Sequence, residues 1–283
     1  MNYYVYTTVA KVKTLSDILA TTSDALILDM IRQASKEIND ISNRSYDPMI
    51  ATRLYDTPGQ KNKYIYQTYV PDLLLDADLL SLTTLTNGDG TVITSTDYKL
   101  YPLNSTPKNK MTLLHTHYVW QPDTNGNPNG AISLNGIWGY HEDYGDAWDT
   151  VTTLSTAITT AGQTTVTVPT GTIAAGDFLK IDSEFIYVKS VAVSTTDTIT
   201  MDRGVNGSTA TTHLISAPVY RWAPMPDVEM LTRRAAVAYT KLRANPIGET
   251  INVDGITYST PKDVNKWIDG QLATLGLIRT GMG

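Results

Sequence analysis

Two histidines, His115 and His117, are the first side chains in this sequence whose spacing could hold a metal ion. If they lie on a strand, residues two apart point to the same face, so both imidazoles could reach one ion. No third ligand accompanies them at a metal-site spacing, and short histidine pairs of this kind are usually solvated. We therefore predict neither a metal site nor a cofactor.

A run of carboxylates near the middle of the chain could bind a hard cation such as Ca²⁺ through its oxygen atoms. The run consists of Glu142, Asp143, Asp146 and Asp149. Its spacing differs from that of an EF-hand loop, so a solvated acidic loop is the better interpretation.

A second carboxylate pair, Asp182 and Glu184, has the composition that glycosidases use for acid and base catalysis. Two residues apart on a strand, these side chains would share a face, but the simpler interpretation places each on an exposed strand edge. The GxxxxGK[ST], GxSxG and GxGxxG motifs are absent from the sequence, and the run from Gly204 to Gly207 is typical of a turn. We predict that the chain is not an enzyme.

One basic cluster stands out in a chain of net charge -6. It consists of Arg233, Arg234, Lys241 and Arg243, on the polar side of a predicted helix. The cluster is either a solvated face or a contact for an acidic partner or a DNA backbone. The overall acidity argues against a surface that grips phosphates, although DNA could slide through an acidic passage.

Composition narrows the class of protein further. A chain of 283 residues can bury a hydrophobic core without disulfides or structural metals to stabilise it. The absence of cysteine excludes disulfides and thiolate metal sites, which fits assembly in a reducing cytoplasm. The N-terminus has no signal-peptide pattern, and the uncharged stretch 151–176 is too rich in threonine for a membrane helix, so we expect no membrane partner. The 17 tyrosines against 2 phenylalanines suggest subunit contacts.

Three amphipathic helices are predicted, one near the start of the chain and two near its end. The first lies within residues 23–48, begins at Ser23 or Asp24, is stopped by residues 46–48, and has an apolar stripe at alternating spacings of four and three. The second opens at 224–227 and ends before Pro246, and the third follows a capping box at 260–263. The stripe positions are Ile27, Ile31, Ala34, Ile38 and Ile41 in the first helix; Val228, Leu231, Ala235, Ala238 and Leu242 in the second; and Val264, Trp267, Ile268, Leu272 and Leu275 in the third.

Short strands are predicted between these helices. They cover 51–56, 63–67, 79–86, 91–101, 111–120 and 131–140, with a tight hairpin at 87–90, and then 164–168, 178–182, 184–191, 197–202 and 217–222. A further hairpin joins 251–253 to 256–258. One or two helical turns are also predicted at 14–19.

We therefore predict an α+β fold in which the N- and C-terminal helices form a bundle beside a small antiparallel sheet. The expected domains are a core of 1–150, an inserted all-β minidomain of 151–222, and C-terminal helices and tail of 223–283. The apolar stripes either form the core or contact sister copies.

The order of these elements resembles that of the head-to-tail connector, or adaptor, proteins of tailed bacteriophages. In that family an N-terminal helix ends in an arginine followed by an aromatic residue, here Arg44 and Tyr46. A later strand ends in a Trp-Gly-Tyr-like turn, here residues 138–140. The resemblance covers most of 10–150 and 223–275.

A second segment resembles a β module found within phage structural proteins. It carries Gly176-Asp177, then residues 181–184 with the sequence IDSE, then the run from Arg203-Gly204 to His213. In those modules this run is a turn-rich closure with no known catalysis. Its presence as an insert departs from the minimal connector.

The connector resemblance implies a homo-oligomeric, dodecameric ring in the virion neck, between capsid and tail, assembled in the host cytoplasm. Such a ring docks under the portal protein and above a downstream neck or tail protein, and genomic DNA passes through it without sequence-specific binding. We expect the C-terminal helix and tail to reach the portal, so deleting 270–283 should abolish portal binding without unfolding the chain. The expected contact residues are Trp267, Ile268, Leu277, Ile278 and Arg279.

Two other functions stay open. The threonine-rich β module could use its tyrosine and tryptophan side chains to bind carbohydrate, as part of a receptor-binding virion protein. A hydrolase acting through Asp182, Glu184 or the acidic loop is a weaker alternative.

Overall fold

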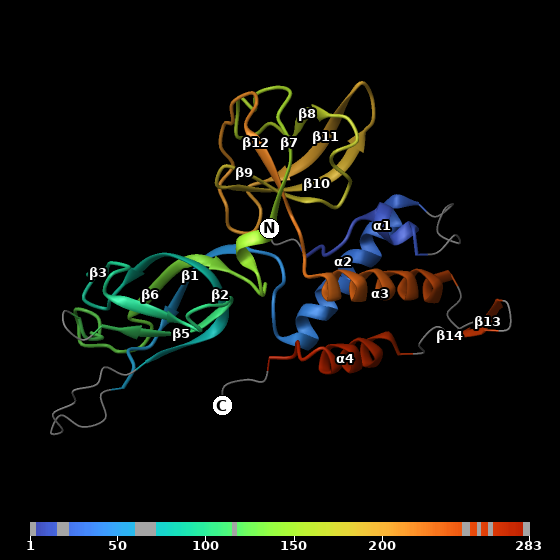
Figure 1. Ribbon diagram of the computed structural model, residues 1–283. Coiled ribbons are helices and arrows are strands. Elements are labelled where there is room, and N and C mark those ends of the chain that lie inside the picture. The colour runs from blue at the N-terminus through green and yellow to red at the C-terminus, as the bar shows by residue number, and fades with distance from the viewer. Residues whose placement is uncertain are drawn as a thin grey trace. The chain divides into compact units, whose positions relative to one another are not determined.

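The computed structural model describes residues 4–15, 23–59, 72–114, 118–244, 250–253, 256–259 and 263–279. It divides into two compact units (Figure 1). Unit 1 combines 1–47 with 146–281, and unit 2 comprises 48–145.

The predicted fold class, a helical bundle beside a small sheet, is wrong. Most of the regular structure is β, in two six-stranded antiparallel sheets. The prediction underestimated the first sheet because its longest strand, β2 (Leu73–Thr86), contains two register shifts against β6 and one against β5. A bulge interrupts the alternation of apolar and polar residues from which strands are recognised, so only 79–86 was predicted.

The helices of unit 1 pack on one another within a single chain. They are α1 (Val9–Lys13), α2 (Asp24–Ser42), α3 (Pro226–Ala244) and α4 (Val264–Thr274), and α2 contacts the other three. The apolar stripe of α2 is buried against these neighbours, with Ile27, Ile31 and Ile38 fully covered. In α3, Val228 and Leu231 are also buried, whereas Leu242 stays half-buried.

The helix ends differ in detail from those expected. Ser23 is the N-cap of α2 but makes no side-chain capping bond, and Asn43 ends the helix in the left-handed region with φ 53°. The cap of α4 is Asp263, whose carboxylate accepts the Lys266 N–H at 3.0 Å. Helix α1 was not predicted, and of the turns predicted at 14–19 only 14 and 15 lie within the described residues.

The sheet of unit 1 is formed by the 148–222 segment. Its strands are β7 (Trp148–Thr153), β8 (Thr165–Pro169), β9 (Phe178–Ile181), β10 (Glu184–Ala192), β11 (Thr196–Arg203) and β12 (Pro218–Trp222), in the order β7-β12-β9-β10-β11-β8. The five strands predicted between 164 and 222 are confirmed, and β7 was missed. The sheet curls so that its two edge strands, β7 and β8, come close together. The Ser155 N–H, just after β7, donates to the Thr167 carbonyl of β8 at 3.0 Å. Aliphatic side chains fill its interior.

Aromatic residues cover the opposite face of this sheet. Trp148 lies 5.0 Å from Trp222 and 5.7 Å from Phe185 between ring centroids, and Phe178 joins them. The Trp222 indole N–H donates to the Tyr46 carbonyl at 3.2 Å. This face therefore joins the sheet to the helical part of unit 1.

Unit 2 is built around its own sheet. Its strands are β1 (Met49–Tyr55), β2, β3 (Val92–Ile93), β4 (Tyr98–Tyr101), β5 (Lys108–Leu113) and β6 (Ile132–Trp138), in the order β1-β6-β2-β5-β4 with β3 on β2. The predicted hairpin at 87–90 is confirmed by the 2.9 Å bond from Gly90 N–H to the Asn87 carbonyl. Trp138 fills the core, and its indole N–H donates to the Ala51 carbonyl. The strand predicted at 63–67 lies outside the described residues.

Two remaining elements complete the chain. Strands β13 (Thr250–Val253) and β14 (Ile256–Ser259) pair as the predicted hairpin, and a 3-10 turn, η2, spans Tyr144–Asp146. Among the described helices, none combines the length and apolarity needed to cross a membrane.

Candidate functional site

A cluster of four titratable side chains, three of them buried, lies at one end of the unit 1 sheet. Glu184 at the start of β10 accepts from Arg203 Nε at 2.9 Å and faces His213 Nε2 at 2.7 Å. The other imidazole nitrogen, Nδ1, lies 2.7 Å from Asp182 Oδ2. The side chains of Glu184 and His213 are fully buried, whereas that of Asp182 is 60% exposed.

The chain from Arg203 to His213 wraps around the Glu184 carboxylate. The Gly204 N–H donates to Oε1 and the Thr211 N–H donates to Oε2, each at 3.1 Å. Gly204 is in the left-handed region, with φ 59°, which glycine adopts without a steric penalty. The turn-rich run is therefore held in place by its hydrogen bonds to the buried carboxylate of Glu184.

The electrostatics of Glu184 are set by these contacts. Burial by itself raises its pKa, but hydrogen bonds from Arg203, His213 and the Thr211 N–H together outweigh burial, so the pKa of Glu184 is lowered. Each imidazole nitrogen of His213 faces a carboxylate, Nδ1 that of Asp182 and Nε2 that of Glu184. The cluster is a charge-compensated network that holds strand ends together.

The interpretation of Glu184 as an exposed edge residue is therefore wrong. Asp182 is exposed as expected, but it lies in the turn between β9 and β10 and not on a strand. Both Glu184 oxygens and both His213 nitrogens are occupied by partners within the chain. A substrate would have to displace a buried ion pair to reach them.

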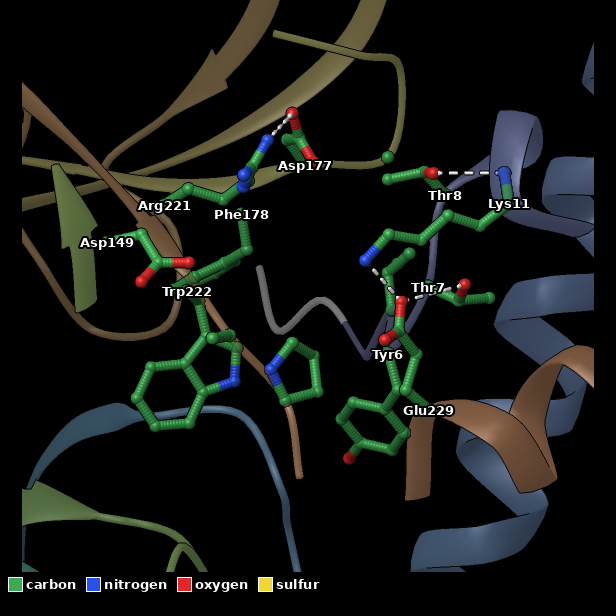
Figure 2. A pocket seen from close by; sticks show the side chains of 14 residues that line it. Tyr6, Thr7, Thr8, Lys11, Asp149, Asp177, Phe178, Arg221, Trp222 and Glu229 are labelled. Atoms are coloured by element: carbon green, nitrogen blue, oxygen red, sulfur yellow. Dashed lines mark hydrogen bonds and ion pairs between the residues drawn. The ribbon is translucent and has the colours of Figure 1, made fainter. Parts of the chain in front are cut away.

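A small pocket of about 90 Å³ lies elsewhere in unit 1, where the N-terminal segment meets α3 and the sheet (Figure 2). On one side, Lys11 Nζ lies 2.6 Å and Arg233 Nη2 2.9 Å from Glu229 Oε1. On the other, Arg221 Nη1 lies 3.9 Å from Asp177 Oδ2. These pairs make the pocket a junction of opposite charges.

The two carboxyls at this junction have opposite pKa shifts. Burial raises the pKa of Asp177, and the Ala174 N–H and Arg221 offset this only in part. Burial also raises the pKa of Glu229, but the hydrogen bonds from Lys11 and Arg233 outweigh burial, so the pKa of Glu229 is lowered. The charges on each side of the pocket are therefore already paired, those of α1 and α3 with one another and those of the β segment with one another.

A polar junction that the sequence did not reveal lies where α2 ends. The Tyr6 hydroxyl donates to Asn39 Oδ1 and accepts the Tyr46 N–H at 3.1 Å. Asp47 Oδ2 accepts the Val5 N–H at 3.1 Å, and burial raises the pKa of Asp47 well above its usual value. The only signal was the abundance of tyrosine in the chain as a whole, which suggested subunit contacts.

The C-terminal tail closes on the same junction. The Tyr46 hydroxyl donates to the Leu277 carbonyl at 3.4 Å, and the Arg279 N–H donates to the Ser42 carbonyl at 2.8 Å. Ile268 and Leu277 are buried in the chain, whereas Trp267, Ile278 and Arg279 keep part of their surface exposed.

The other candidate residues do not converge. His115 and His117 lie outside the described residues. Glu142, Asp143, Asp146 and Asp149 are exposed, and the described part of the chain contains no group of three metal-ligating side chains. Of the basic cluster, Arg233 is paired with Glu229.

The aromatic side chains proposed for carbohydrate binding are mostly turned inward. Trp222 and Tyr187 of the unit 1 sheet are buried, and Trp148 and Tyr220 are half-buried around Lys180. These four rings therefore do not offer the exposed, coplanar surface on which a sugar would stack.

Neither the scan against models of known protein families nor the search of curated proteins finds a match to this chain.

Proposed function

We propose that this protein is a structural component of a tailed-phage virion that forms a ring joining the portal to the neck or tail, around the passing DNA. The proposal rests first on the sequence resemblance, in which Arg44, Tyr46 and residues 138–140 match the connector pattern. In the folded chain, Arg44 and Tyr46 come just after α2, and Trp138 is the last residue of β6.

The observation that carries the proposal is the role of Tyr46. Its backbone and side chain contact the N-terminal segment through Tyr6, the end of the sheet through Trp222 and the tail through Leu277. The two tyrosine rings meet edge to face, with centroids 5.6 Å apart. The aromatic residue after the N-terminal helix therefore has a structural role, because it connects the N-terminal segment, the sheet and the tail around the helices.

The same layout suits a scaffold. Both sheets begin and end on paired strands, Met49 opposite Trp138 in unit 2 and Trp148 opposite Trp222 in unit 1. Each β segment therefore starts and finishes at adjacent points of the chain path. Such an arrangement lets one helical core carry two β surfaces, which is what a joining protein requires.

The subunit contacts of the proposed ring must lie on other surfaces than the apolar stripes. Ile27, Ile31, Ile38, Val228 and Leu231 are already covered within one chain. For the portal, the residues with available surface are Trp267, Ile278 and Arg279.

The test is assembly. Mass photometry and negative-stain microscopy of the purified protein, alone and with the portal of the same phage, should show rings seated on the portal. Trp267→Ala with Ile278→Ser should weaken portal binding, whereas Leu214→Ser, which changes an exposed residue of the unit 1 β segment, should not. A chain that stays monomeric in both samples would overturn the proposal.

A further inference from the structure

The outer face of α3 carries cations that the described residues leave without partners. Asp227, Met230, Arg234, Val237 and Lys241 follow one another at spacings of three, four, three and four, so they share one side of the helix. Arg234 is exposed, Met230 is 37% exposed, and Val237 and Lys241 are half-buried. The opposite side of α3 is buried against α2.

Most other cations of the helical core are paired. Lys11 and Arg233 bind Glu229, Lys13 binds Asp24, and Lys36 binds Asp40. In the described part of the chain, Arg234 and Lys241 have no ion pair and no side-chain hydrogen bond. Two turns of helix separate them by about 10 Å, so they present two positive points flanking Val237.

A complementary acidic turn lies in unit 2. Unit 2 contains nine carboxylates against four lysines or arginines in its described ranges. Glu142 and Asp143 are exposed, and no described cation pairs with them. The Tyr140 hydroxyl donates to Glu142 at 3.0 Å, which leaves the negative charge of that carboxylate uncompensated.

This turn is held in one conformation. Thr106 Oγ1 donates to the carbonyls of His141 and Glu142, at 2.9 and 3.0 Å, and accepts the Tyr144 N–H at 3.3 Å. A fixed backbone reduces the conformational entropy lost when the carboxylates meet a partner. Helix α3 is equally fixed, since Ala235 and Ala236 are fully buried.

We infer that the outer face of α3 binds the Glu142–Asp143 turn of a second copy of this chain. The two patches differ, so the contact is heterologous, and heterologous contacts close a ring when the rotation between copies divides a full turn. The inference rests on the proposed ring and names one of its subunit contacts. Met230 and Val237 supply the apolar centre, and Arg234 and Lys241 select the partner by charge.

Charge-swap variants test the contact. Arg234→Glu with Lys241→Glu should raise the protein concentration for half-assembly at least about tenfold, because like charges then face each other. Glu142→Lys with Asp143→Lys should do the same. Mixing the two variants, or combining all four changes in one chain, should restore assembly. Arg243→Glu is the matched control, because it reverses an exposed cation on another side of α3.

The outcomes separate the two proposals. If the wild-type protein never forms rings, the proposed function itself fails. If the charge-reversed variants form rings as readily as wild type, or if combining the two reversals does not restore assembly, the α3 contact is refuted while the proposed ring is not. If the α3 reversal lowers only the retention of duplex DNA, this face contacts DNA and the inference is also refuted. Unchanged circular dichroism and melting of each variant show that folding is intact.

Discussion

The Nε2 atom of His213 lies 2.7 Å from the Oε2 atom of Glu184, and both side chains are fully buried. Glu184 begins β10 and His213 ends the turn-rich run, so their contact holds that run against the end of the sheet. A buried pair of this kind is costly to break because the remaining partner stays charged and desolvated.

We predict that Glu184→Gln destabilises the protein by about 3–5 kcal/mol, since Arg203 would lose its buried counter-charge. Asp182→Asn should cost less than about 1 kcal/mol, because that side chain is exposed and asparagine tolerates the left-handed φ of 53° found there. Urea unfolding followed by tryptophan fluorescence measures both. Equal losses would contradict the assignment of Glu184 as the centre of the network.

The pH dependence of this effect has a defined sign. Because the folded-state pKa of Glu184 is lowered, its contribution to stability is complete above the unfolded value of about 4.3 and is lost as the pH falls through the folded pKa. The difference in unfolding free energy between wild type and Glu184→Gln should therefore be largest near pH 7 and shrink below about pH 4. A difference that grows on acidification would disprove the lowered pKa.

Asp47 should show the opposite dependence. Burial raises its folded-state pKa, so the unfolded chain ionises first and wild-type stability falls as the pH rises above the unfolded value of about 3.9, until the folded pKa is passed. Asp47→Asn keeps an acceptor for the Val5 N–H and removes the charge. Its stability relative to wild type should increase as the pH rises above about 4, until the folded pKa of Asp47 is passed, measured by chemical denaturation. Asp89→Asn, in the exposed turn after β2, serves as the control.

In unit 2, Gly136→Ala should destabilise the protein by about 1–3 kcal/mol through overpacking. A Cβ at this position of β6 would lie 2.4 Å from the Ser81 carbonyl oxygen of β2, so the strands would have to separate. Gly59→Ala introduces a methyl group that no atom of the described residues approaches within 4 Å, and it should be nearly neutral. Thermal unfolding compares the two, and similar melting temperatures would argue against the close approach.

The tail is part of the folded core, which changes the expected result of truncation. Deleting 270–283 would remove the buried side chains of Leu272 and Leu277, so we now expect loss of folding rather than selective loss of portal binding. Leu277→Ala should cost about 2–5 kcal/mol, and Leu275→Ala, at an exposed position, should cost much less. Differential scanning calorimetry distinguishes them.

The helices and the later strands could be predicted because their patterns are local. The three-and-four spacing from Ile27 to Ile38 is kept in α2, and the alternation of buried and less buried residues is kept in β8 and β11. Strands β10 and β12 each contain one register shift but are short enough to be recognised. Strand β2 could not be predicted in full, since its bulges move successive leucines between faces. The fold class was wrong for the same reason, as strand pairing over long sequence distances decides how large a sheet becomes.

The candidate sites were predicted less well. Asp182 and Glu184 were recognised as a pair, but nothing local indicates that Arg203 and His213 return to Glu184 from about twenty and thirty residues away. The Tyr6, Tyr46 and Asp47 junction likewise joins segments that are adjacent only after folding. Burial of a charged residue depends on partners, and partners distant in sequence leave no periodic signal.

The pairing of Trp148 with Trp222 means that the segment between them departs and returns within the spacing of two neighbouring strands. The two ends of this segment lie as close together as the ends of a short loop, because the Ala223 N–H donates to the Ala147 carbonyl at 2.9 Å. A different module that entered and left the chain at this point would keep the connection between the helices, provided that it replaced the contact that Trp222 makes with Tyr46.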